Sequence, residues 1–328
     1  MNVRCFMVTR RKLLKNSVLA ASAFALPLEA AGAGAKKIRI GLITDIHKDL
    51  VPDADERLRS FIDLMNKESV DAIMQLGDFC TPKPANQGFL DIFNGFRGPR
   101  YHVLGNHDTD GGFRREQTMA FWGMKQRYDS FDLGGYHFIV LDANDRPKDW
   151  KGGYPRSIAA DQLEWLHKDL ENTRLNTFVF LHQSLERPDC ITNQEEVRTI
   201  LEAAKTQDGK RKVAGCFNGH WHIDHSRVIN GIPYTHINSA SYYYMGGVRN
   251  DSVDPELAKK FPILTMSANY DGPLYTVLEI DPAGGTFTIR GMESKWRGKS
   301  PQEIAPDRKK EEDAWARPTI SAGQWTVS

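Results

Sequence analysis

Hydrophobic and polar residues alternate along the chain in a pattern that changes period several times. Short apolar runs typical of buried strands are followed by stretches in which apolar residues recur at helical spacing. This alternation predicts βαβ units and a largely parallel sheet. The predicted strands end at Asp45, Asp78, Asn106, His182 and within 211–222. The predicted helices lie within 53–69, 157–173 and 195–207, the second with Ser157 as its N-terminal cap.

Paired apolar runs joined by turn residues predict three hairpins. The first covers 130–142 and turns at Gly134 and Gly135, and the second covers 226–241 and turns at Asn230 and Gly231. The third covers 273–293. Residues 245–272 lack a strong period and are expected to form an insertion or a lid over a site.

The two ends of the chain differ from its middle. Residues 1–35 combine a basic start, a short apolar run and small residues, which is the layout of a signal peptide. Arg10 and Arg11 resemble the twin-arginine type, which implies export by the twin-arginine translocation machinery to the periplasm or the medium. A cytosolic basic helix is the alternative. Residues 36–300 form the predicted domain, and 301–328, charged and broken by proline, are expected to be a tail with little core of its own.

The composition is that of an ordinary globular protein and narrows the choice of partners. The chain has 328 residues, 40% hydrophobic and 26% charged, with a formal net charge of +1. This balance gives no general attraction to nucleic acid, and no segment of the mature chain is apolar for long enough to span a membrane. Cys80, Cys190 and Cys216 have no zinc-finger spacing and are expected to be small buried side chains.

Metal-binding side chains follow the predicted strands. Ligands collect beyond the carboxyl ends of strands in open α/β sheets. Residues two apart on an extended segment point the same way, so such pairs can converge on one ion or on two neighbouring ions. Mixed imidazole and carboxylate ligands suit manganese, iron or zinc better than calcium or magnesium. The candidates are Asp45, His47, Asp78, Asn106, His107, Asp108, His182, His220 and His222.

These segments, in this order, closely resemble the calcineurin-like metallophosphoesterase family over roughly residues 37–240. The resemblance implies an α/β fold of two packed mixed sheets flanked by helices, and hydrolysis of a small phosphate ester at a centre of two transition metal ions. It assigns Asp45, His47 and His222 to one metal, Asp78 to both, and Asn106, His182 and His220 to the other. His107 would act as general acid, steadied by Asp108. These motifs fit phosphodiesterase, monoesterase and pyrophosphatase branches alike, and of these a phosphodiesterase is expected ahead of a monoesterase.

Several assignments stay open at the level of sequence. A metal-bearing binding protein without turnover needs the same ligands but neither His107 nor Asp108, and an exported nuclease needs a basic groove. Trp221 is expected to pack in the core and His225 to be solvated. Tyr242, Tyr243 and Tyr244 are expected either to pack as strand aromatics or to form a wall beside the substrate.

Overall fold

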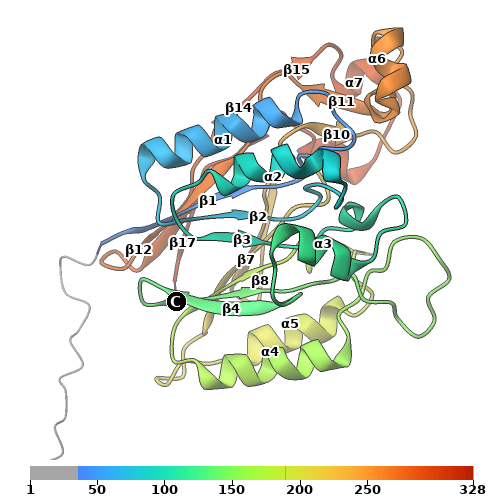
Figure 1. Cartoon of the computed structure of the whole chain (residues 1–328). Coiled ribbons are helices and arrows are strands. Elements are labelled where there is room, and N and C mark those ends of the chain that lie inside the picture. The colour runs from blue at the N-terminus through green and yellow to red at the C-terminus, as the bar shows by residue number, and fades with distance from the viewer. Residues whose placement is uncertain (1–35, 189, 328) are drawn as a thin grey trace, which may run out of the picture.

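Two six-stranded mixed sheets pack face to face, with helices on their outer faces (Figure 1). The computed structural model describes residues 36–188 and 190–327, so the predicted signal peptide lies outside the described residues. Strand β1 (Ile38–Ile43) shows how the sequence specifies the layers. Ile40 and Leu42 point between the sheets, whereas Ile43 points toward the helices, because successive side chains of a strand alternate. The predicted architecture is confirmed.

The first sheet joins strands from the two ends of the described chain. Its strand order is β17-β13-β12-β1-β2-β3, in which β1, β2 and β3 are parallel and the others antiparallel. The predicted hairpin of 273–293 forms β12 and β13 and extends this sheet. The strands besides β1 are β2 (Ala72–Gln75), β3 (Arg100–His102), β12 (Thr276–Asp281), β13 (Thr286–Ile289) and β17 (Gly323–Thr326).

The second sheet has a parallel centre and antiparallel edges, in the order β4-β5-β6-β7-β9-β8. Both predicted hairpins form here, and Asn230 and Gly231 take φ values of 49° and 84°, as the tight turn requires. The strands are β4 (Asp129–Leu133), β5 (Tyr136–Val140), β6 (Thr177–Phe180), β7 (Val213–Asn218), β8 (His225–Ile229) and β9 (Ile232–His236).

Amphipathic helices cover the outer face of each sheet. Helices α1 (Ala54–Glu68) and α2 (Gln87–Asn94) pack on the first sheet, and α4 (Ala160–Asn172) and α5 (Gln194–Ala203) on the second. Helix α4 begins two residues after Ile158, and Ser157 does not cap it, since its hydroxyl donates to Asn193 Oδ1 instead. The remaining helices are α3 (Arg115–Trp122), α6 (Pro255–Lys260) and α7 (Pro301–Ile304), and the 3₁₀ turns are Pro84–Asn86, His107–Thr109, Pro262–Met266 and Glu311–Trp315.

The region from residue 301 onward is part of the fold, which corrects the prediction of a tail with little core of its own. Strand β17 pairs with β13 along its length, and Ile320 and Val327 are buried in the core between the sheets. Residues 245–272 contribute to a small sheet at one end of the molecule. That sheet has three strands, β10 (Tyr242–Tyr244), β11 (Ser267–Tyr270) and β15 (Trp296–Arg297). Strands β14 (Met292–Glu293) and β16 (Thr319–Ile320) form a separate pair.

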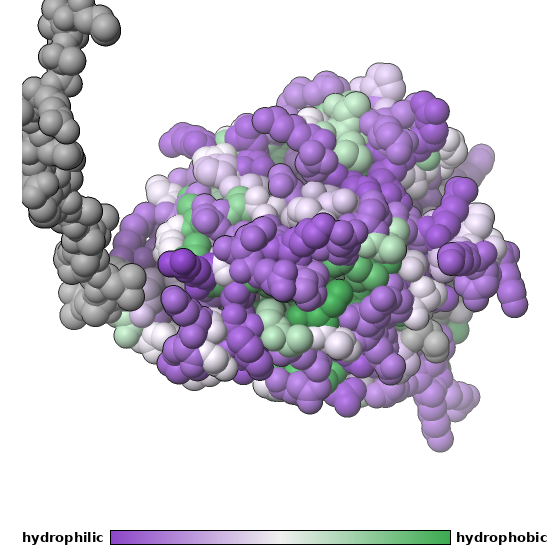
Figure 2. Space-filling view, turned by 90° about the horizontal axis from the view of Figure 1, so that it is seen from below, coloured by the Kyte–Doolittle hydropathy of each residue, from purple (hydrophilic) through white to green (hydrophobic). Residues whose placement is uncertain are grey.

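The surface is largely hydrophilic on the face that α4 and α5 form. Figure 2 views the protein from that side and shows polar residues over most of it, with a smaller hydrophobic area among them. Cys80, Cys190 and Cys216 are buried free thiols, as predicted. Within 36–188 and 190–327, no helix combines the length and the apolar character needed to cross a membrane.

Candidate metal centre

Six of the predicted ligands meet at the carboxyl ends of the central strands, in two adjacent groups. Asp45, His47 and His222 form one group, and within each group the candidate ligand atoms lie within 4.8 Å of one another. Asp78, His182 and His220 form the other. Asp78 Oδ2 lies 3.1 Å from His182 Nε2 and 3.8 Å from His47 Nε2, so this carboxylate faces both groups. That position fits a bridging ligand.

Each carboxylate is held by one oxygen and turns the other toward the imidazoles. Asp45 Oδ2 accepts hydrogen bonds from Thr44 Oγ1 at 2.6 Å and from the His220 amide at 3.0 Å. Its Oδ1 lies 3.0 Å from His222 Nε2. Asp78 Oδ1 accepts from the His107 amide at 2.8 Å. Both side chains are therefore fixed in orientation by the protein itself, as metal ligands commonly are.

Two histidines are oriented by backbone carbonyls. His182 Nδ1 lies 2.8 Å from the carbonyl oxygen of Leu76, and His222 Nδ1 lies 2.8 Å from that of Tyr242. If each Nδ1 donates to its carbonyl, Nε2 is left as an acceptor that faces the other ligands. The Nε2 atoms of His47 and His222 lie 3.2 Å apart. If both atoms carry lone pairs, a cation bound to both accounts for this short separation. The donor set fits a metal on the geometry of the side chains alone.

The backbone of this cluster is strained. Of the seven non-glycine residues with positive φ in the described chain, five are candidate ligands. A residue with a side chain takes this left-handed conformation at a cost of order 1–3 kcal/mol, and such strain gathers at functional sites. The five are Asp45 (51°), His47 (55°), Asp78 (51°), His220 (71°) and His222 (54°).

Glycines beside the ligands provide space for them. A Cβ atom on Gly105 would overlap the Asp78 carboxylate, and one on Gly219 would overlap the Asp45 carboxylate and the Thr44 hydroxyl. This explains why Asn106 and His220 each follow a glycine: a larger residue would push a ligand out of place.

Asn106, the seventh predicted ligand, lies beside the second group and lines the same cavity as Asp78 and His220. Its Oδ1 is buried and has no hydrogen-bond partner within the described part of the protein. A buried amide oxygen without a partner is costly, and a cation next to it would remove that cost. This is a second, independent sign that a metal belongs here.

Burial and charge set the protonation of the ligands. Burial lowers the pKa of His47 and of His220 to about 3, so both imidazoles are neutral and able to coordinate. Burial opposes ionisation of Asp45 and Asp78, but the adjacent imidazoles of His222 and His182 outweigh it and hold the pKa of both carboxyls below the ordinary value. The same carboxylates raise the pKa of His182 to about 10 against the effect of burial.

His107 is held by Asp110 and Tyr154 rather than by Asp108, which corrects the prediction. His107 Nδ1 lies 2.6 Å from Asp110 Oδ2 and 2.9 Å from the Tyr154 hydroxyl, which donates to Asp110 Oδ1 at 2.8 Å. Asp110 Oδ2 is the acceptor for a proton on Nδ1, so Nε2 is left for a reacting group. Asp110 lies three residues beyond His107 on one 3₁₀ turn, a signal that the sequence contained. Tyr154 comes from the loop between β5 and α4, and no pattern marks it.

Asp108 instead ties the loops together. Its carboxylate accepts three backbone amide protons, from Asp78 at 3.0 Å, Phe79 at 2.7 Å and Gly105 at 2.7 Å. The residue is buried and holds the loop after β2 against the loop after β3. Asp108 therefore positions Asp78 and Asn106 without touching the His107 ring.

Both groups open onto one cavity of about 460 Å³. Its walls beyond the ligands are mainly aromatic, and the C-terminal region adds two cations and the carboxylate of Glu312. Trp221 packs against the core between the sheets, as predicted, and also lines this cavity. His225 packs on Trp315 at 3.9 Å between ring centroids instead of facing solvent. The wall residues are Leu50, Tyr154, Trp221, Tyr242, Tyr243, Tyr244, Gly246, Ile263, Arg308, Lys310 and Glu312.

Comparison with known proteins places the chain in a family. The model of the calcineurin-like phosphoesterase family matches residues 38–224, more than half of the chain, and the protein belongs to that family. With two candidate metal-binding groups, this supports a metal-dependent phosphoester hydrolase that uses two ions. A search of curated proteins found no match.

Solved structures share the fold at low sequence identity. A dimetal phosphatase from Danio rerio has a TM-score of 0.55 and 14% identity, over 79% of this chain and 98% of that one. GAP50, the anchor in the inner membrane complex of Plasmodium, has a TM-score of 0.51 and 13% identity, over 89% of each chain. At such identities the likeness supports the fold alone.

Proposed function

We propose that the protein hydrolyses small phosphodiesters in preference to monoesters, with His107 as the general acid. The observation that carries the proposal is that both ligand groups and the His107 ring line one cavity, which continues along an aromatic wall. A diester carries a second organic group that can bind along the aromatic wall. A monoester has no such group, so this part of the cavity would stay unused.

The protein's own groups divide the chemistry between them. Asp45, His47 and His222 would hold one ion and Asn106, His182 and His220 the other, with Asp78 shared, and manganese, iron or zinc suits these donors. When bound, two such ions supply a hydroxide nucleophile near neutral pH and neutralise charge on the phosphoryl oxygens.

His107 supplies the proton that the leaving group needs. Asp110 and Tyr154 fix its Nδ1, and a proton on Nε2 can pass to the departing alkoxide or aryloxide oxygen. Burial opposes the charged form, but Asp78 and Asp110 raise the pKa of His107 to about 9, so without bound metal the ring is protonated at neutral pH. This arrangement supports turnover over a role in binding alone.

A direct comparison of substrates tests the proposal. The manganese-loaded protein is assayed on bis-p-nitrophenyl phosphate and on p-nitrophenyl phosphate, with Asn106→Ala as the metal-site control. We expect a higher kcat/KM for the diester and a large loss in the variant. A preference for the monoester would replace the phosphodiesterase assignment with a phosphatase. Metal binding without turnover of either ester would favour a binding protein.

We further propose that residues 1–35 direct export by the twin-arginine translocation machinery. The support is the sequence alone, since this segment lies outside the described residues. Replacement of both Arg10 and Arg11 by Lys should leave the protein in the cytoplasm, as cell fractionation would show. Unchanged export of that variant would contradict the proposal.

A further inference from the structure

Trp221 stands between two candidate ligands in the sequence but has its own fixed setting. Its indole Nε1–H donates to the sulfur of buried Cys190 at 3.2 Å. The guanidinium carbon of Arg187 lies 4.8 Å from the Trp221 ring centroid and 5.0 Å from that of Trp315. Arg187 is therefore sandwiched between two indoles, and Trp221 is braced from one side.

The rest of the Trp221 ring faces the cavity. The residue is half-buried and lines the same cavity as His220, His222 and Asn106. Because Arg187 occupies one face of the indole, the surface that remains for the cavity belongs to the other face and the edge. A rigid aromatic surface next to a reacting centre favours a flat, weakly polar ligand group.

The neighbouring wall is held just as firmly. Arg308 donates to the Met245 carbonyl oxygen at 3.0 Å and to the Tyr243 hydroxyl at 3.2 Å, and its guanidinium lies 3.2 Å from the Asp313 carboxylate. Its charge is thereby used to fix the wall and is not available to recognise a ligand. Tyr242 and Tyr243 are buried behind this wall, and Trp221 and the exposed Tyr244 supply its accessible aromatic surface.

We propose that Trp221 is a specificity-determining residue that stacks on an aromatic ring in the non-leaving ester group of the substrate. This inference rests on the proposed function, because it concerns the organic group of an ester whose phosphorus lies at the two ligand groups. A simple aryl ester and a nucleoside ester both present such a ring. The shared chemistry is a planar aromatic group, and the test separates the two sources.

The experiment holds the leaving group constant. The manganese-loaded enzyme is given methyl p-nitrophenyl phosphate, phenyl p-nitrophenyl phosphate and thymidine 5′-p-nitrophenyl phosphate, and kcat/KM is measured for each. The readout is the ratio of each aromatic substrate to the methyl ester, so that a general loss of activity cancels. Trp221→Ala and Trp221→Leu remove the flat ring, the second with most of its apolar bulk kept, and Trp221→Phe keeps a ring.

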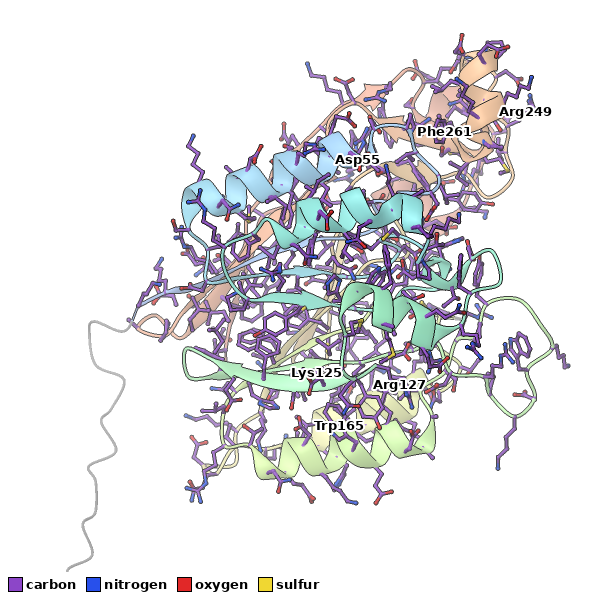
Figure 3. All side chains as sticks on the ribbon, in the orientation of Figure 1. Asp55, Lys125, Arg127, Trp165, Arg249 and Phe261 are labelled. Atoms are coloured by element: carbon purple, nitrogen blue, oxygen red, sulfur yellow. The ribbon has the colours of Figure 1, made fainter. Side chains whose placement is uncertain are left out.

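The matched control is Trp165→Ala. Trp165 is a half-buried indole on α4, against Tyr128 and on the α4 side of the molecule (Figure 3). It does not line the cavity. Its loss tests whether removal of any partly buried indole changes the ratio.

We expect wild type and Trp165→Ala to prefer an aromatic ester, and Trp221→Ala and Trp221→Leu to lower that preference about three- to tenfold, with Trp221→Phe between them. If the variants lower the kcat/KM ratio for the thymidine ester alone, the Trp221 surface binds a nucleoside. If they lower the ratio for both aromatic esters, it binds aryl groups in general. Equal ratios in wild type and all variants, with hydrolysis intact, would overturn the inference and leave the proposed function standing. No hydrolysis of any ester by wild type would contradict the proposed function instead.

Discussion

The metal-binding cluster and the aromatic wall of the cavity are built in different ways. The cluster comes from strand ends within residues 38–224, and its backbone is strained at five ligands. Much of the wall comes from β10 and from residues 308–312, beyond the family match, and Arg187 and Arg308 brace its side chains. In the proposed function, the cluster carries out the chemistry and the wall selects the substrate.

The largest effect is expected from Gly219→Ala, which tests how tightly the cluster is packed. The new methyl group would overlap the Asp45 carboxylate, displace a ligand and lower kcat/KM at least about 100-fold. Bound metal should fall in parallel, as elemental analysis would show. Gly88→Ala in α2 is the control, because a Cβ there meets nothing within 4 Å. Full activity of Gly219→Ala would mean that the cluster is looser than the structure indicates.

His107→Ala separates proton transfer from metal binding. We expect both ions to be retained and the rate to fall about 10²- to 10⁴-fold for esters with poor leaving groups, since those depend on general acid catalysis. Good leaving groups should lose much less. A series of substituted phenyl esters measures this dependence, and an equal loss across the series would remove His107 from the role of acid.

Asp110→Asn tests the support of that acid through the pH profile. Asp110 is one of the groups that raise the pKa of His107, so its neutralisation should lower that pKa. In the proposed role His107 acts when protonated, so activity should be lost as pH rises through its pKa. The alkaline limb of kcat/KM should therefore move to lower pH by about one unit. An unchanged limb would show that another group controls it.

The smallest effect is expected in the wall. Arg308→Lys would lose hydrogen bonds to Met245 and Tyr243 and loosen the wall, so KM for a phosphodiester should rise several-fold at unchanged kcat and metal content. Arg249→Lys is the control, since this arginine is exposed near α6 and pairs with Asp251 (Figure 3). A loss of metal in Arg308→Lys would show that cluster and wall are not independent.

The sequence predicted the cluster better than the wall for a physical reason. Strand periodicity locates each strand end, and parallel strands bring their ends together, so Asp45, Asp78, Asn106, His182 and His220 could be grouped from local patterns. Tyr154 could not, because it reaches His107 from a loop that has no period. The strands near the C-terminus were missed because their few apolar residues, such as Ile320 and Trp325, stand among small and polar neighbours, and because these strands pair with distant ones.

Asp108 shows a different limit. Adjacency in the sequence suggested that it supports His107, but the 3₁₀ turn directs its carboxylate to three backbone amides and brings Asp110 to the ring instead. The sequence analysis placed the correct residue types at this turn. It did not predict the direction of their side chains, because that direction depends on a single turn of backbone.

Metal stoichiometry tests the central claim most directly. The purified protein is loaded with manganese, freed of excess ion, and its metal content per chain is measured by mass spectrometry beside turnover of bis-p-nitrophenyl phosphate, for wild type and Asp78→Ala. Because Asp78 faces both ligand groups, we predict two ions per chain in wild type, and loss of bound metal and of turnover together in the variant. Two ions and full turnover in Asp78→Ala would contradict the account.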